Sequence, residues 1–136
     1  MNFDEQFLVR EAMLARENSY SPYSGFRVGA ALLTESGTVY CGCNIENAAY
    51  SPTNCAERTA FFKAVSEGER KFRAIAVAGD TDDYLYPCGV CRQVMAEFCS
   101  FQDFVVICVK SETEYKKLLL KDLLPGAFTK SDLQKI

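Results

Sequence analysis

Two short cysteine-containing segments constrain the fold of this chain more than any other feature of its sequence. They are Cys55-Ala56-Glu57 and Pro87-Cys88-Gly89-Val90-Cys91, in a chain that contains no histidine. Three thiols at this spacing supply three of the four positions of a tetrahedral zinc site, whereas a structural zinc site normally has four protein ligands. A carboxylate two residues after the first thiol is placed to act on a water in the fourth position. The fold must therefore bring the two segments together in space.

Hydrophobic periodicity predicts helices that alternate with short apolar strands. The expected helices cover residues 2–18, 55–67 and 87–98. The expected strands cover residues 28–33, 38–43, 74–78 and 104–109, while residues 115–120 fit either a strand or a helix. We expect Asn2 and Glu5 to form a capping box on the first helix, and Asn54 to cap the second. This order predicts one sheet between helical layers, with a short polar tail after Pro125-Gly126.

Composition indicates a soluble globular protein of one domain over residues 1–136. Of its residues, 49% are hydrophobic, which is enough for a core without disulfides. The net charge of −3 and the lack of a long Lys/Arg run argue against a polynucleotide partner. We see no signal peptide and no apolar run near the roughly 20 residues that span a membrane. We therefore expect a cytoplasmic protein, whose seven cysteines are metal ligands or small buried residues and not disulfides.

Both cysteine segments open a predicted helix, which favours metal binding. The unpaired N–H groups of a helix N-terminus lower the pKa of a thiol, and the thiolate is the form that zinc binds. Three thiolates around one Zn²⁺ leave a negatively charged site, which needs compensation. Arg58 is the candidate for this tuning of the metal charge, with a solvated helix residue as the alternative. Arg92 is expected to face solvent.

The Cys88 and Cys91 pair alone is open to two other interpretations. A thioredoxin-like redox motif also opens a helix after a strand, but it leaves Cys55-Ala56-Glu57 unexplained. A structural zinc site needs a fourth ligand, which one of the remaining cysteines would have to supply. We expect these to be small buried residues instead; they are Cys41, Cys43, Cys99 and Cys108.

The two segments match the signature of zinc-dependent deaminases, with Cys55 in place of the first histidine. Three further blocks are similar to the small cytidine deaminases: residues 20–32, the ribose-binding block 44–48, and 123–125 with Phe128. The chain thus resembles, over nearly its whole length, the short homotetrameric class of the cytidine and deoxycytidylate deaminase family. This resemblance implies an α/β fold, a three-layer α/β/α sandwich with a central mixed sheet of about five strands.

The resemblance also implies a function in pyrimidine salvage: hydrolysis of free cytidine and deoxycytidine to uridine and deoxyuridine plus ammonia. One zinc ion per chain, held by Cys55, Cys88 and Cys91, activates water, and Glu57 shuttles its proton. The implied substrate-binding residues are Asn44, Glu46, Phe26, Ala56 and Phe128. Asn44 and Glu46 hold the ribose, Ala56 offers a backbone N–H to the base, and Phe26 is an apolar wall. Phe128 is expected to reach a neighbouring pocket in a homotetramer with shared active sites.

Each assignment has a simpler alternative in the sequence. Glu57 at its spacing from Asn54 fits a capping box, and Asn44 fits an Asx-turn. Glu46 fits a solvated carboxylate, whereas Phe26 and Phe128 fit ordinary packing within their own chain. For the whole protein, the alternatives are a deaminase of a cytosine-nucleoside antibiotic such as blasticidin S, a non-enzymatic zinc-binding module, and a thiol redox protein.

Overall fold

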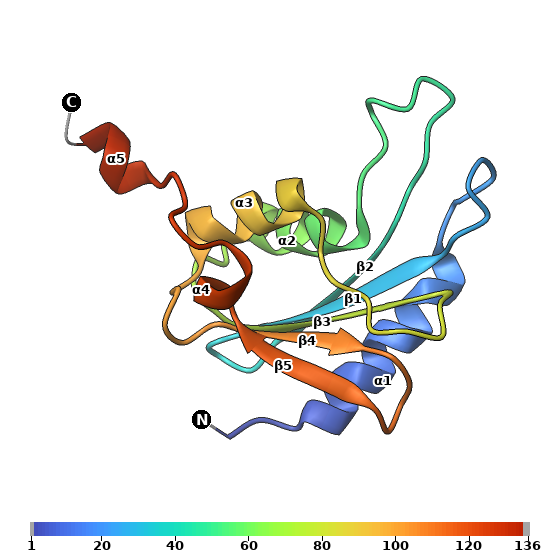
Figure 1. The fold of residues 1–136 in the computed structure, drawn as a ribbon, viewed down its shortest axis with the longest axis horizontal. Coiled ribbons are helices and arrows are strands. Elements are labelled where there is room, and N and C mark those ends of the chain that lie inside the picture. Colours follow the sequence, from blue (N-terminus) through green and yellow to red (C-terminus); the bar gives the residue numbers. More distant parts are fainter. Residues whose placement is uncertain (1, 135–136) are drawn as a thin grey trace.

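The computed structural model describes residues 2–134, which form a five-stranded sheet with helices on both faces (Figure 1). The strands are β1 (Val28–Thr34), β2 (Val39–Cys43), β3 (Phe72–Gly79), β4 (Val105–Val109) and β5 (Tyr115–Leu119). Their order in the sheet is β2-β1-β3-β4-β5. The β3 and β4 strands are parallel, an arrangement that requires a crossover connection such as the helix between them, and the other pairs are antiparallel. The mixed five-stranded α/β fold is therefore confirmed.

The helices divide into two layers. They are α1 (Glu5–Ala15), α2 (Ala56–Ser66), α3 (Gly89–Phe98), α4 (Leu120–Leu123) and α5 (Lys130–Gln134), with a 3-10 turn at Arg16–Asn18. The α1 helix covers one face of the sheet, where Leu8, Val9 and Ala12 are buried. The α2 and α3 helices cover the opposite face, where Phe61 and Met95 are buried (Figure 1).

Strand β1 shows why its sequence reads as a continuous apolar run. Ala30 and Leu32 belong to the core beneath α2 and α3, whereas Ala31 and Leu33 belong to the core beneath α1. Successive side chains of a strand point to opposite faces, so a strand buried on both sides needs apolar residues throughout. Within residues 2–134, no helix is long and apolar enough to cross a membrane.

The structure corrects both predicted helix caps. Asp4, and not Asn2, caps α1, because its carboxylate accepts the N–H of Phe7 at 3.0 Å. Glu5 accepts instead from Lys117 Nζ at 2.6 Å, a partner from β5. The α2 helix begins after Cys55, and the Asn54 amide donates to Thr59 Oγ1 at 3.1 Å.

The C-terminal region also differs from the prediction. Residues 115–120, which fitted either a strand or a helix, are divided between β5 and the start of α4. The segment expected to be a polar tail contains the short helix α5, which lies well away from the sheet (Figure 1). Residues 124–134, called the C-terminal arm below, therefore lead away from the sheet, with a bond to α3 at Phe128.

Candidate metal centre

The three thiols meet where α2 and α3 begin. Cys55 and Cys88 are the residues directly before α2 and α3, both in extended conformation, and Cys91 lies in the first turn of α3. Neither Cys55 nor Cys88 uses its side chain to cap its own helix. Since both helices cover the same face of the sheet, their N-termini bring the sulfurs of two distant segments together.

Gly42 of β2 allows α2 to lie this close to the sheet. A Cβ atom at this position would be 2.6 Å from both the Ala56 carbonyl oxygen and the Ala60 nitrogen. These are backbone atoms, which cannot turn aside as a side chain would. The first turn of α2, which carries Glu57, therefore rests directly on the β2 backbone.

The spacing of the sulfurs fits zinc. The three Sγ atoms lie within 4.8 Å of one another, and those of Cys55 and Cys88 are 3.8 Å apart. Tetrahedral zinc with bonds of about 2.3 Å to sulfur places its sulfurs about 3.8 Å apart. Among residues 2–134, no other group of three or more histidine, cysteine or acidic side chains is close enough to hold a metal ion.

The charges around the sulfurs also fit a cation. The hydrogen bond from Cys91 and the guanidinium of Arg58 lower the pKa of Cys55 to about 5. Arg58 Nη2 lies 3.2 Å from Cys55 Sγ, where it can offset thiolate charge. The bond to Cys55, together with burial, raises the pKa of Cys91. Cys91 thus keeps a proton that a divalent cation would displace on binding, as expected of a thiolate ligand.

Glu57 is a buried carboxyl group beside the thiols. Only 4% of the residue is exposed, and burial raises its pKa to about 7. It does not form the capping box that its spacing allowed, because the Asn54 backbone N–H donates to the Ile45 carbonyl. A carboxyl with a pKa near neutrality can both accept and return a proton.

A cavity of about 200 Å³ joins these groups. Five of the ten predicted site residues line it: Asn44, Cys55, Ala56, Glu57 and Cys88. The other lining residues are Val28, Thr53, Asn54, Leu85 and Tyr86. Phe26 does not line it, but packs with Leu85 over Gly79. Glu46 lines an adjoining cavity of about 380 Å³, which shares Thr53 with the first. Phe128, with 58% of its surface exposed, lines neither cavity.

Asn44 and Glu46 organise the loops around the cavity. Asn44 Oδ1 accepts the N–H of Val28 at 2.9 Å, and its Nδ2 donates to the Phe26 carbonyl at 2.8 Å. This arrangement joins two loops and is not an Asx-turn. Glu46 accepts from the hydroxyl and N–H of Ser24 and from the N–H of Tyr23. The Ser24 hydroxyl is the main cause that lowers the pKa of Glu46, which is therefore a carboxylate at neutral pH.

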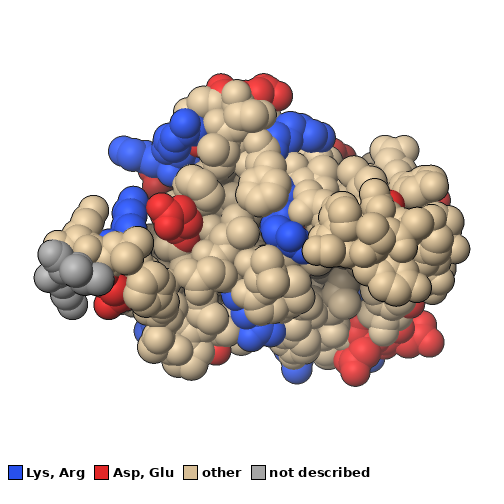
Figure 2. Space-filling view, turned by 90° about the horizontal axis from the view of Figure 1, so that it is seen from above, with Lys and Arg blue, Asp and Glu red and all other residues tan. Residues whose placement is uncertain are grey.

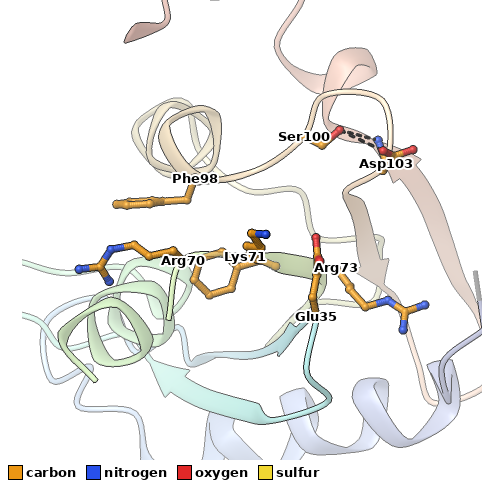
Figure 3. Close-up of a pocket in the computed structure, with 8 residues that line it drawn as sticks. Glu35, Arg70, Lys71, Arg73, Phe98, Ser100 and Asp103 are labelled. Atoms are coloured by element: carbon orange, nitrogen blue, oxygen red, sulfur yellow. Dashed lines mark hydrogen bonds between the residues drawn. The ribbon is translucent and has the colours of Figure 1, made fainter. Parts of the chain in front are cut away.

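A larger cavity of about 560 Å³ lies at the other end of α2 and α3 (Figure 3). Several of its charged and polar side chains bond to the protein itself. Arg70 Nη1 donates to the Val65 and Glu69 carbonyls, each at 2.8 Å, and Ser100 bonds to Asp103. Reactive groups are concentrated instead in the smaller cavity at the thiols.

Sequence reasoning missed Arg92, which was expected to face solvent. The side chain is half-buried and its guanidinium donates to two backbone carbonyls, those of Pro87 and Leu123, each at 2.8 Å. Its position one residue after a zinc ligand was the only signal, and this position alone does not distinguish a bonded arginine from a solvated one.

The fold and the three-thiol site together define a zinc-dependent hydrolase of the deaminase class. A family model described as "Cytidine and deoxycytidylate deaminase zinc-binding region" matches residues 1–108. The chain belongs to the cytidine and deoxycytidylate deaminase family.

Similar proteins cover nearly the whole chain. The cytidine deaminase of Sporosarcina psychrophila is 56% identical over 130 residues, which are 96% of this chain and 95% of the relative. The crystal structure of cytidine deaminase from Burkholderia pseudomallei has 46% identity and a TM-score of 0.88, covering 93% of this chain and all of that chain. The crystal structure of cytidine deaminase from Mycobacterium tuberculosis has 36% identity and a TM-score of 0.83, covering 93% of this chain and 98% of that chain.

Proposed function

We propose that this protein hydrolyses free cytidine and deoxycytidine to uridine and deoxyuridine with release of ammonia. The observation that carries the proposal is the buried Glu57 carboxyl, which shares a cavity with the thiols of Cys55 and Cys88. Its pKa of about 7 suits a group that must act as base and acid in one cycle. We also propose that residues 1–136 form one deaminase domain. The cytoplasmic location of the protein stays a prediction from its cysteine usage.

Glu57 moves the protons in the proposed reaction. Zinc held by the three thiolates supplies the Lewis acidity that lowers the pKa of a water from about 15.7 to about 7. The Glu57 carboxylate takes a proton from that water, whose oxygen forms the new bond to C4 of the cytosine ring. Glu57 delivers this proton to ring N3. It then takes the second proton from the new hydroxyl on C4 and passes it to the amino nitrogen, so that the bond from C4 to this nitrogen breaks, the C4 carbonyl forms and ammonia leaves. Arg58, at 3.2 Å from Cys55 Sγ, limits the negative charge of the ligand set.

The surroundings of the cavity support a nucleoside substrate. Asn44 and Ala56 line it with Glu57, so the loop that Asn44 holds in place and the start of α2 border the same space. Glu46 is ionised in the adjoining cavity and can accept hydrogen bonds from ribose hydroxyls. Phe26 supports the apolar wall through Leu85. On the face shown in Figure 2, Lys and Arg side chains of the described residues lie in separate groups between broad uncharged areas, which favours a small substrate over a polynucleotide.

We further propose a homotetramer in which Phe128 completes the cavity of a neighbouring chain. Two observations support this arrangement. Phe128 is exposed in its own chain, and it belongs to the arm that extends away from the sheet (Figure 1). An aromatic ring placed over the base would exclude water and so strengthen the electrostatic interactions at zinc.

The activity is tested by adding purified protein to cytidine and following the loss of cytidine absorbance, with zinc measured on the same sample. Glu57→Gln is the matched control, because it keeps the size of the side chain but removes the proton carrier. We expect it to stay folded and zinc-loaded while turnover falls roughly 10²- to 10⁴-fold. Zinc-saturated parent protein that leaves cytidine unchanged contradicts the proposal, and turnover of blasticidin S alone would move the protein to the antibiotic deaminases.

The shared site is tested by complementation. Glu57→Gln with Phe128 intact is co-assembled with Phe128→Ala with Glu57 intact, using different tags to isolate mixed oligomers. If Phe128 acts on a neighbouring chain, some cavities combine both intact residues, so activity rises above that of either parent. Mixed oligomers that show no recovery place Phe128 in the cavity of its own chain or outside any cavity.

A further inference from the structure

Three consecutive residues of α3 contact three different parts of the site. Cys91 is a zinc ligand, with 1% of its surface exposed. Arg92 bonds to the segment before Cys88 and to residues 123–128, called here the C-terminal block. Gln93 Nε2 donates to the Phe128 carbonyl at 2.8 Å. The first turns of α3 therefore lie between the metal centre and the C-terminal arm.

Arg92 holds the peptide groups on both sides of Cys88. Its Nε donates to the Pro87 carbonyl, whose oxygen belongs to the peptide bond that enters Cys88. Its backbone N–H donates to the Cys88 carbonyl at 3.0 Å, which belongs to the peptide bond that leaves Cys88. Cys88 is the exposed member of the thiol set, so its own side chain has little packing to fix it. The backbone bond belongs to the first turn of α3 and would form with any residue except proline here, whereas the Nε bond is specific to the arginine. The Nε bond restrains the peptide group before Cys88 and so the direction of the Cys88 sulfur.

The same guanidinium fixes the start of the C-terminal block. Arg92 Nη1 donates to the carbonyl of Leu123, a buried residue at the end of α4. A guanidinium is planar and presents its donors at fixed angles, so bonds to two carbonyls set the position of one relative to the other. Gln93 holds the block at a second point, Phe128, but has no bond to the Cys88 side.

We infer that Arg92 is a positioning residue that joins the Cys88 side of the zinc centre to the C-terminal block. Metal binding and the position of the C-terminal arm therefore both depend on this side chain. The inference rests on the zinc site and not on the identity of the substrate. Groups that orient metal ligands typically change metal affinity 10- to 100-fold when they are lost, so we expect a loss of roughly this size here.

The test compares zinc affinity and arm protection in matched variants. Arg92→Met keeps the apolar stem but loses both side-chain bonds. We expect weaker zinc binding in competition with a chromophoric chelator, a changed absorption spectrum after cobalt substitution, and faster amide exchange at Leu124. Gln93→Ala loses only the arm contact, so exchange in the arm should rise while zinc affinity stays at the parent value.

Two further variants separate positioning from general loss of stability. Arg70→Met also removes an arginine with two carbonyl bonds of 2.8 Å, but at the far end of α2 (Figure 3). It should leave zinc affinity and the cobalt spectrum unchanged. Arg92→Lys keeps the charge but reaches one carbonyl at a time, so its zinc affinity should lie between those of the parent and Arg92→Met. If Arg92→Met does not fold, Arg92→Lys replaces it in the comparison. Parental zinc affinity in folded Arg92→Met or Arg92→Lys, or equal losses in Arg92→Met and Arg70→Met, overturns the inference.

Discussion

Gly42 offers a direct test of how the sheet positions the reacting groups. A Cβ atom at this residue would lie 2.6 Å from two backbone atoms of α2, against an ordinary closest contact of 3.4 Å. In Gly42→Ala, the first turn of α2 must therefore move outward by about 0.8 Å. Overpacking of this kind costs about 1–3 kcal/mol of the free energy of unfolding.

The displacement should affect chemistry more than stability. Cys55 and Glu57 sit at the end of α2 that moves, whereas Cys88 and Cys91 are held by α3. A misplacement of about 1 Å between reacting groups lowers turnover roughly 10²-fold. We expect a loss of this size in kcat for cytidine, counted per zinc-loaded chain, together with a modest fall in Tm.

Gly68→Ala is the matched control at the opposite end of α2. Gly68 has a φ of 100°, so alanine is strained there, but its Cβ would meet no atom within 4 Å. This variant should lose about 1–2 kcal/mol of stability without displacing α2. Full turnover per zinc-loaded chain in Gly42→Ala, or an equal loss in Gly68→Ala, would refute the argument that contact with Gly42 sets the position of Cys55 and Glu57.

Three further predictions concern metal, substrate and pH. Cys55→Ala should lose zinc and show a Tm that no longer responds to chelator, because metal binding contributes to folding free energy; Cys43→Ala, outside the thiol group, should keep its zinc, as metal analysis would show. Cytidine should be a far better substrate than cytidine monophosphate or single-stranded DNA, because Glu46 is negatively charged beside the cavity; comparable rates on all three would contradict this. Hydrogen bonds from Arg27 lower the pKa of Asp80, so this pair stabilises the fold above the unfolded pKa of about 3.9 and the effect is lost as pH falls through the folded pKa. Asp80→Asn should therefore lower Tm at pH 7 but lose its effect in acid, and a difference independent of pH would contradict the assignment.

The zinc centre was predictable because it consists of two pairs of residues, each pair close in sequence. Cys88 and Cys91 are three residues apart, and Cys55 and Glu57 two apart, so local helix geometry fixes each pair. Only the meeting of the two segments needed the fold, and one sheet with both helices on the same face supplies it. Glu57, Arg58 and Asn44 also lie beside this centre, although their roles in the reaction stay predictions.

Long-range hydrogen bonds decided what the sequence left open. Asn2 and Asp4 are both good capping residues, and the sequence does not show which one the chain will use. Glu5 has its partner on β5, more than a hundred residues away, and Arg92 has one in Leu123. Residues 115–120 satisfied both periodicities, and pairing with β4 turned most of them into a strand. None of these partners can be read from local spacing.

The order of the strands determines how copies of this protein can associate. The two outer strands, β2 and β5, each expose one side whose backbone groups are open to pairing with another chain. Lys63 reaches across β2 and donates to the Cys41 carbonyl, while Lys116 and Lys117 place exposed charges along β5. Charged lysines on an outer strand oppose the addition of a further strand. Growth of a continuous sheet from one copy to the next is thus disfavoured at both edges of the sheet.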